Sequence, residues 1–295
     1  MSDQGKSHGR HVDEFSGVET TGHEWDGIRE LDNPLPRWWQ WIFWACVIWS
    51  IGYWVVYPAW PLVSTHTKGM FGYSSRGDVA KAIETANAGM AGQLERIRKA
   101  PLEQIRTEAS LREFALAGGR SAFAVNCTQC HGSGAQGFKG FPNLNDDEWI
   151  WGGTVDAIAY TITHGVRNTE DEQARASDMP AFGRDQILTK AQISDVAEYV
   201  MALSGSGPGG QPAVRGQAIF AENCAACHGP AGEGSAEFGA PALNNTIWLY
   251  GGDKATLVET ITNSRRGVMP AWGRHLDAAT VKQLAIYVHS LGGGK

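Results

Sequence analysis

The strongest constraint on this chain is a sequence that occurs twice. GGRSAFAVNCTQCHG, around Cys127 and Cys130, is matched by RGQAIFAENCAACHG, around Cys224 and Cys227. Later motifs repeat in the same order, FPNL and APAL, WIWGG and WLYGG, DMPAFGR and VMPAWGR, then AEYVMALSG and AIYVHSLGG. We therefore expect two homologous domains, at 113–204 and 212–295, separated by a Gly- and Pro-rich linker at 205–211.

Each repeat ends in a segment with helical periodicity. Apolar residues recur at spacings of three and four, as at Val196 and Val200 in the first repeat and at Leu284 and Val288 in the second. No segment alternates apolar and polar residues convincingly, as a half-buried strand would. The fold class is therefore all-α with long loops, and the repeats differ chiefly by a polar insertion around 168–177 in the first.

Residues 38–57 read WWQWIFWACVIWSIGYWVVY and contain no charged side chain. As a helix, this run would span about 30 Å, the thickness of the hydrocarbon core of a membrane. Aromatic residues gather at both ends, as they do at the two lipid interfaces, and Pro58 ends the helix. We expect a retained transmembrane anchor in contact with membrane lipid, because a cleaved signal peptide would not follow 37 largely polar residues.

The segments on either side of this anchor are expected to differ. The tail at 1–37 carries eight acidic and four basic residues with little apolar periodicity, so we expect it to stay mobile until a partner orders it. Residues 58–112 are expected to form a helical spacer that breaks at Pro101. The chain as a whole has 25 basic and 31 acidic residues, a net charge of -6, which excludes a typical nucleic-acid binder.

CxxCH is the sequence of covalent c-type haem attachment. Two thiols bond to the porphyrin, and the spacing lets one helical turn present both sulfurs while the adjacent histidine binds the iron. A lone CxxC also fits a redox pair or half of a zinc site, but two CxxCH motifs in register within a repeat favour two covalently bound haem c groups. The expected haem-binding residues are Cys127, Cys130 and His131 in the first repeat and Cys224, Cys227 and His228 in the second.

Both repeats resemble class I cytochrome c. In that family a downstream methionine is the sixth iron ligand, and a proline carbonyl accepts the histidine N–H two residues before a leucine that contacts the haem. The resemblance implies these roles, repeat by repeat, for Met179, Pro142 and Leu144, and for Met269, Pro241 and Leu243.

His164 is a rival sixth ligand for the first haem. It lies 15 residues before Met179, and the second repeat has no histidine at the equivalent place. The resemblance to class I cytochrome c also implies that a glycine and an aromatic residue of each first helix pack against an aromatic residue of the last helix in the same repeat. These sets are Gly119, Phe123 and Tyr199, and Gly216, Phe220 and Tyr287.

An iron with histidine and methionine ligands has no open position for a substrate, so such a chain only moves electrons. The resemblance also implies that the haems are attached outside the bacterial cytoplasmic membrane, so we expect periplasmic haem domains and a cytoplasmic N-terminus. Residues 141–180 carry eight acidic and two basic side chains. This charge could attract a basic partner, or it could be a merely solvated face.

The order of tail, single span and two c-type domains, with TTGHEWDGIRELDNPLPRWW at 20–39 and YPAWP at 57–61, looks like the di-haem subunit, subunit III, of cbb3-type cytochrome c oxidases. The resemblance implies a non-catalytic electron-transfer subunit of an inner-membrane oxidase. Its donor would be a soluble or membrane-bound cytochrome c or the cytochrome bc1 complex. Its acceptors would be a mono-haem cytochrome c subunit and the catalytic haem–copper subunit that reduces oxygen.

Two alternatives stay open at this point. A membrane-tethered cytochrome serving a periplasmic dehydrogenase would use the same two haem domains. A di-haem peroxidase would need one iron without a strong sixth ligand, and the two methionines, Met179 and Met269, argue against it.

Overall fold

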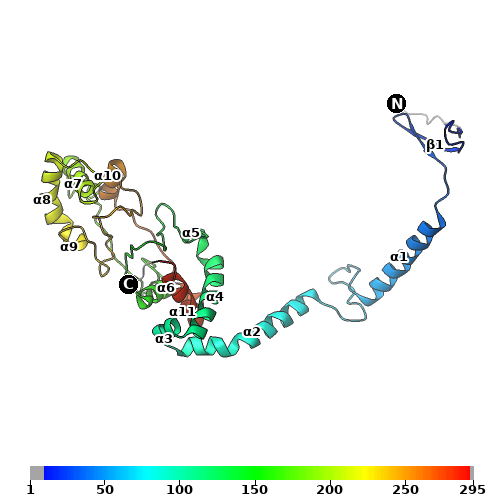
Figure 1. Ribbon diagram of the computed structural model, residues 1–295, viewed down its shortest axis with the longest axis horizontal. Helices are drawn as coiled ribbons and strands as arrows, with labels where there is room; N and C mark the ends of the chain where they lie inside the picture. Colours follow the sequence, from blue (N-terminus) through cyan, green and yellow to red (C-terminus); the bar gives the residue numbers. More distant parts are fainter. Residues whose placement is uncertain (1–9, 293–295) are drawn as a thin grey trace. The chain divides into compact units, whose positions relative to one another are not determined.

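The computed structural model describes residues 10–292, and the chain divides into two units, one ending at Ala86 and the other beginning at Asn87. Apart from one hairpin, the regular structure of the described residues is helical, as expected (Figure 1). The elements are β1 (Thr20–Trp25), β2 (Ile28–Leu31), α1 (Arg37–Val56), α2 (Ser75–Lys99), α3 (Leu102–Thr107), α4 (Ala109–Asn126), α5 (Thr128–His131), α6 (Val155–His164), α7 (Lys190–Leu203), α8 (Gln211–Asn223), α9 (Ala225–His228), α10 (Lys254–Asn263), the 3-10 helix η1 (Trp272–Arg274) and α11 (Ala278–His289).

The hairpin lies in the N-terminal tail. Strands β1 and β2 pair antiparallel, and the turn between them is Asp26-Gly27, whose φ angles are 51° and 85°. Two successive positive φ angles are what a two-residue hairpin turn of this kind requires, and Asp-Gly favours it. Arg29 Nε donates to Glu24 Oε2 across the strands at 2.9 Å. The expectation of a tail without structure of its own is therefore wrong for residues 20–31, while residues 1–9 of that tail lie outside the described part.

Helix α1 confirms the expected apolar helix, with bounds shifted by one residue. It begins after Pro36 and ends before Tyr57, and none of its residues is buried. Among residues 10–292 it is the one helix long and apolar enough to cross a membrane. At the far end the rings of Trp54 and Trp60 lie 4.9 Å apart, an aromatic cluster suited to a lipid interface.

Helices α2 and α3 form the spacer and break at Pro101, as predicted. The C-terminal end of α2 is held by Lys282 of α11, whose Nζ donates to the carbonyl oxygens of Arg98 at 2.9 Å and Ala100 at 2.7 Å. The last carbonyls of a helix lack partners within it, so a cation is favourable there.

The two repeats build two helical bundles. The α4 bundle contains α3, α4, α5, α6, η1 and α11, and the α8 bundle contains α7, α8, α9 and α10. Phe123 and Phe220 are buried at their centres, 2% and 1% exposed. The core of the α4 bundle also includes Ile97 and Ile105, both fully buried. This bundle therefore uses residues from the expected spacer, before position 113.

Each bundle takes its last helix from the other repeat. Helix α11, at the end of the second repeat, packs against α4 and α6, while α7, at the end of the first, packs against α8 and α10 (Figure 1). The Phe123 and Tyr287 ring centroids are 5.5 Å apart, and those of Phe220 and Tyr199 are 5.2 Å apart. The expected pairing within each repeat, Phe123 with Tyr199 and Phe220 with Tyr287, is wrong.

The two first-helix glycines face the exchanged helices as well. A Cβ on Gly119 would lie 2.2 Å from the Gln283 carbonyl oxygen of α11, and a Cβ on Gly216 would lie 2.0 Å from the Asp195 carbonyl oxygen of α7. Such approaches are possible only without a side chain. The resemblance therefore implies the correct role for both glycines but the wrong partner helix.

A short connection favours the exchange. Helix α7 ends at Leu203 and α8 begins at Gln211, so residues 204–210 keep these two helices close together. Elements consecutive in the chain usually become neighbours in space. Because α7 and α11 carry similar apolar stripes, either helix could cover either bundle, and periodicity alone does not distinguish the two arrangements.

The bundles contact one another through equivalent loops of the two repeats. Gly140 donates its backbone N–H to the Leu249 carbonyl oxygen at 2.8 Å, and a Cβ on Gly140 would lie 3.2 Å from the Tyr250 ring. Gly239 is the counterpart of Gly140, and a Cβ on it would lie 2.2 Å from the ring of Trp151, the counterpart of Tyr250. The same patch is thus used twice, as in a two-fold symmetric dimer.

Candidate haem sites

The two CxxCH motifs have the same backbone structure. Cys127 ends α4 and begins the single turn of α5, where the His131 N–H donates to the Cys127 carbonyl oxygen at 2.9 Å. In the second repeat His228 donates to Cys224 at 3.0 Å. One helical turn therefore brings both cysteines and the histidine of each motif to one place, as the spacing predicts. The four cysteines form no disulfide.

Each histidine is oriented by a proline carbonyl. His131 Nδ1 lies 3.0 Å from the Pro142 carbonyl oxygen, and His228 Nδ1 lies 2.9 Å from that of Pro241. A carbonyl only accepts hydrogen bonds, so Nδ1 carries the proton and donates it. Nε2 is then the nitrogen with a free lone pair, the atom that binds a metal.

Burial tunes the chemistry of both motifs. Burial lowers the pKa of His131 and of His228, against the smaller opposing effect of the proline carbonyls. A lowered pKa keeps the imidazole neutral, which is the form that ligates iron. Burial also raises the pKa of the Cys127 and Cys224 thiols to about 11. These thiols are therefore uncharged at neutral pH.

Trp149 offers a test of whether a haem fits the first site. Its indole Nε1 is buried and has no hydrogen-bond partner among the described residues. The side chain packs against the α4-bundle core, as do Cys127 and Leu144. A buried donor without an acceptor is costly, and a haem carboxylate would supply the acceptor. The residues present thus fit the group. Trp149 lies in the repeated motif WIWGG, but nothing in that motif alone indicates that its indole nitrogen is buried without a partner.

The two predicted methionine ligands lie in different bundles from those expected. Met269 packs against the α4-bundle core, together with Cys127 and Leu144. Met179 packs against Phe182, and its loop hydrogen-bonds to the end of α10 in the α8 bundle. The structure therefore brings Met269, not Met179, to the bundle of His131. Leu243 packs in the α8 bundle with Cys224, on the expected side.

His164, the rival ligand for the first haem, contacts the polar insertion of the first repeat through its Nδ1. Its Nδ1 lies 3.0 Å from Asp171 Oδ2, and its ring lies 4.5 Å from that of Tyr160. Hydrogen bonds from Gln173 and His164 lower the pKa of Asp171. Two features that the second repeat lacks, His164 and the polar insertion that carries Asp171, therefore contact one another.

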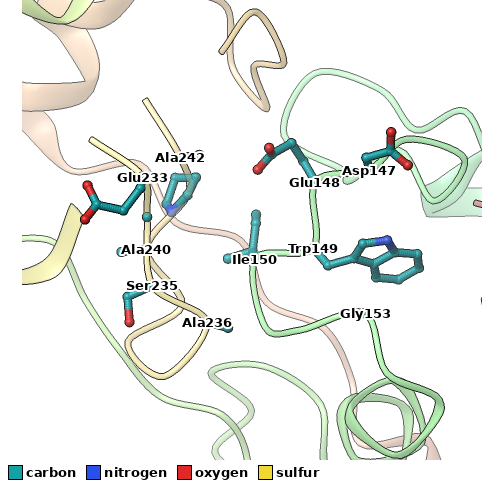
Figure 2. A pocket seen from close by; sticks show the side chains of 12 residues that line it. Asp147, Glu148, Trp149, Ile150, Gly153, Glu233, Ser235, Ala236, Ala240 and Ala242 are labelled. Carbon is teal, nitrogen blue, oxygen red and sulfur yellow. The ribbon is translucent and has the colours of Figure 1, made fainter. Parts of the chain in front are cut away.

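Two cavities lie where the repeats meet. The first, of 270 Å³, is lined by residues 147–150 and 153 of one repeat and by residues 233–236 and 240–242 of the other. Figure 2 shows Glu148 and Ile150 facing the segment of Ala240, while Trp149 points away. Burial raises the pKa of Glu148. The second cavity, of 560 Å³, has Pro142 and Trp248 in its wall. The prolines that hold both histidines therefore border the contact between the two bundles.

Known protein families and relatives match nearly the whole chain. Residues 17–64 match the family described as the N-terminal domain of cytochrome oxidase-cbb3, FixP; residues 116–204 match cytochrome c; and residues 211–288 match cytochrome c oxidase, cbb3-type, subunit III. The FixP subunit of the cbb3-type oxidase of Azorhizobium caulinodans is 54% identical over 100% of both chains. The CcoP subunit of Azospirillum brasilense is 52% identical over 96% of this chain and 98% of its own.

Proposed function

The chain belongs to the subunit III family of cbb3-type cytochrome c oxidases, the di-haem electron-transfer subunits FixP and CcoP, and from this we propose how its parts carry electrons. It is part of an oxidase complex with other subunits and carries two covalent haem c groups, one for each cytochrome c domain. Oxygen reduction takes place in another subunit. The full-length match disfavours a tethered cytochrome serving a dehydrogenase.

The haems are bound by the two CxxCH motifs. Cys127 and Cys130 hold the first haem, and Cys224 and Cys227 hold the second. When bound, each haem c supplies an iron that accepts and releases one electron. His131 and His228 bind the iron through Nε2. The observation that carries this assignment is the pair of matched contacts, at 3.0 and 2.9 Å, between histidine Nδ1 and a proline carbonyl oxygen.

The anchor sets the orientation in the bacterial inner membrane. Helix α1 crosses once, with the N-terminal hairpin on the cytoplasmic side and both haem bundles in the periplasm. Two features support this topology, the absence of buried residues in α1 and the requirement that covalent c-type haem be attached outside the cytoplasm.

The two bundles form a relay. A soluble or membrane-bound cytochrome c, or the cytochrome bc1 complex, donates electrons, and this chain passes them to the mono-haem subunit and the haem–copper subunit. The contact of Gly140 with Leu249 and of Gly239 with Trp151 supports direct transfer between the domains, because it holds them together through loops near both haem-binding histidines.

Purification of the native protein from membranes in mild detergent tests this function. We expect it to co-purify with subunits that show b-type as well as c-type absorption, and carbon monoxide should bind a haem in those other subunits. Both haems of this chain should be inert to carbon monoxide. Isolation as a lone c-type protein would contradict the oxidase role, and carbon monoxide binding by this chain would contradict a purely electron-carrying role.

A further inference from the structure

We propose that the loop at 58–74, between α1 and α2, binds the periplasmic surface of the membrane as a second anchor. Its exposed apolar side chains enter the lipid beside the end of α1, and basic side chains in and just after the loop meet phospholipid phosphates. This inference rests on the proposed orientation of α1, and it adds a membrane contact that a single crossing helix does not require.

The loop folds back onto the last turn of α1. The backbone N–H of Met70 donates to the Val55 carbonyl oxygen at 3.0 Å. That of Phe71 donates to the Val56 carbonyl oxygen at 3.2 Å. The last carbonyls of a helix have no partners within it, and an unpaired carbonyl is costly where lipid excludes water. The loop therefore completes the end of the helix, and Met70 and Phe71 lie level with its last turn.

Gly69 makes this close contact possible. A Cβ on Gly69 would lie 2.3 Å from the Val56 carbonyl oxygen, and Gly69 has a φ of 70°. The close approach and the backbone conformation both favour glycine. Gly72 also has a positive φ, of 58°, but a Cβ there would meet open space. Of these two glycines, Gly69 is therefore the one that lets the loop lie against α1.

Residues 60–67 form a tight turn within the loop. The backbone N–H of Thr67 donates to the Trp60 carbonyl oxygen at 2.9 Å. The Thr67 hydroxyl oxygen accepts from the backbone N–H groups of Ala59 and Trp60, at 3.2 and 3.0 Å. Backbone groups at the base of the turn are thus paired within the loop, as contact with lipid requires. Val63, between the two paired ends, is fully exposed.

The exposed side chains of the loop include large apolar ones. Val63 and its neighbour Leu62 project from the turn, the latter 58% exposed. Met70 and Phe71, level with the last turn of α1, are 76% and 70% exposed. Exposed apolar side chains are stabilised when lipid removes them from water. The loop therefore offers apolar contacts both at its turn and where it meets the helix.

Aromatic rings connect the loop to α1. The Tyr57 ring centroid lies 5.8 Å from that of Phe71 and 5.6 Å from that of Tyr73. The Trp60 ring lies 4.9 Å from that of Trp54 in the last turn of α1. Tyrosine and tryptophan gather at the level of the lipid headgroups, where the ring is in an apolar environment and its polar atom stays hydrated. These rings indicate that the loop lies at this level.

The charge of this region fits the phosphate groups of a membrane surface. Residues 38–77 contain Lys68 and Arg76 and no aspartate or glutamate. Both basic side chains are exposed. Lysine and arginine close to a membrane are attracted by anionic lipids, whereas carboxylates would be repelled. Apolar, aromatic and basic side chains without acidic ones are the composition of a segment that lies in a lipid interface.

Photocrosslinking in the purified oxidase tests this contact. Benzoylphenylalanine replaces Val63 or Phe71, and the complex is reconstituted in vesicles of phosphatidylethanolamine and phosphatidylglycerol. After illumination, mass spectrometry identifies what each position has bonded to, and we expect phospholipid adducts at both. The same probe in place of Ile48, exposed in the middle of α1, is the positive control. In place of Glu84, exposed on α2, it should give no phospholipid adduct.

Two sets of variants test the cause of the contact. Gly69→Ala should lower the yield of phospholipid adducts at Phe71, because a Cβ there pushes the loop away from α1, whereas Gly72→Ala should keep it. Equal yields in these two variants would contradict a loop fixed to the helix. Lys68→Gln combined with Arg76→Gln should lower the share of phosphatidylglycerol among the adducts. An unchanged share would contradict the contact with phosphate.

Three other results would overturn the proposal. Crosslinks from Val63 and Phe71 to another subunit would show that protein covers the loop. Phospholipid adducts at Ile48 with no adduct at either loop position would place the loop in water. Both of these results would leave the proposed function intact. No phospholipid adduct at Ile48 would instead overturn the membrane anchor, and with it the orientation on which the proposed function depends.

Discussion

The ring of Tyr287, near the end of the second repeat, lies 5.5 Å from the ring of Phe123, in the first helix of the first repeat. This contact joins the two repeats at the centre of the α4 bundle, where Phe123 is 2% exposed. Tyr199 and Phe220 make the reciprocal contact in the α8 bundle. The α4 bundle is therefore built from two separate stretches of chain, 102–164 and 272–289, and the α8 bundle, at 190–263, lies between them in the sequence.

A double-mutant cycle should detect this contact in solution. We expect Phe123→Leu and Tyr287→Leu to be non-additive in the free energy of unfolding, with a coupling of about 0.5–1.5 kcal/mol. Phe123→Leu and Tyr199→Leu should add within about 0.5 kcal/mol because these residues lie in different bundles. Denaturant unfolding of the holoprotein measures both. Coupling of Phe123 to Tyr199 would be inconsistent with the exchanged helices.

The ion pair between Arg215 and Asp195 predicts a pH dependence. The hydrogen bonds from Arg215 lower the pKa of Asp195 below its usual value of about 3.9. A depressed folded-state pKa stabilises the protein above the unfolded pKa, and this contribution is lost as the pH falls through the folded value. Arg215→Gln should therefore raise the pKa of Asp195 and flatten the loss of stability below about pH 4.

NMR titration of the Asp195 carboxyl measures this shift. Arg184→Gln is the matched control, because Arg184 pairs with Asp185 outside the helix contact and should leave the pKa of Asp195 unchanged. An unchanged pKa of Asp195 in Arg215→Gln would show that the pair is absent in solution.

Trp149→Phe tests the buried indole Nε1. If a haem carboxylate accepts from this nitrogen, removing it should destabilise the holoprotein by about 1.5–3 kcal/mol, the range for a hydrogen bond to a charged group. Trp272→Phe is the control, since Trp272 packs against the same core without a buried unpaired nitrogen. Thermal unfolding compares them. Equal or greater stability of Trp149→Phe would mean that nothing accepts from this indole in the holoprotein.

Lys282→Met tests the attachment of the spacer to the haem domains. The substitution keeps an unbranched apolar stem but removes the hydrogen bonds to the carbonyls of Arg98 and Ala100. We expect the covalent haem content to be unchanged and amide exchange near the α2–α3 junction to accelerate by about tenfold, corresponding to about 1.4 kcal/mol. Lys190→Met, at the exposed start of α7, is the control. Unchanged exchange would show that Lys282 does not hold α2.

The acidic stretch of the first repeat predicts that the donor is attracted by charge. Asp147, Asp156 and Glu172 are exposed, whereas Asp178 is paired with Arg266. Replacing the three exposed carboxylates by amides should slow reduction by a basic cytochrome c and weaken the dependence of the rate on ionic strength. Stopped-flow reduction at several salt concentrations measures this. A rate insensitive to salt in the wild type would contradict attraction by this surface.

Much of this architecture follows from local pattern. The anchor at 38–57, the break at Pro101 and the turn that joins Cys127 to His131 are each determined by residues close together in sequence, so periodicity and spacing predict them. The hairpin at 20–31 was predictable too, from Asp26-Gly27, but the acidic composition of the tail suggested disorder instead.

The exchange of helices depends on long-range contacts that local patterns do not encode. Helices α7 and α11 present similar apolar faces, so either fits either bundle by periodicity alone. The information lies in single polar residues, Asp195 and Glu198 of α7, whose partners Arg215 and Lys254 are recognisable only once the helices are placed side by side. Trp149 was overlooked for a related reason, since only the structure shows that its nitrogen is buried without a partner.

The relay of electrons through both haems is tested most directly in the purified oxidase. The fully reduced complex, with carbon monoxide bound at the catalytic site of the haem–copper subunit, is mixed with oxygen. A light flash then removes the carbon monoxide, and the c-type absorbance is followed in time. The account predicts that both haems of this chain are oxidised during turnover without added donor. In the His228→Ala variant, the second haem should no longer be reoxidised as it is in the wild type. Oxygen reduction at full rate while both haems stay reduced would contradict it.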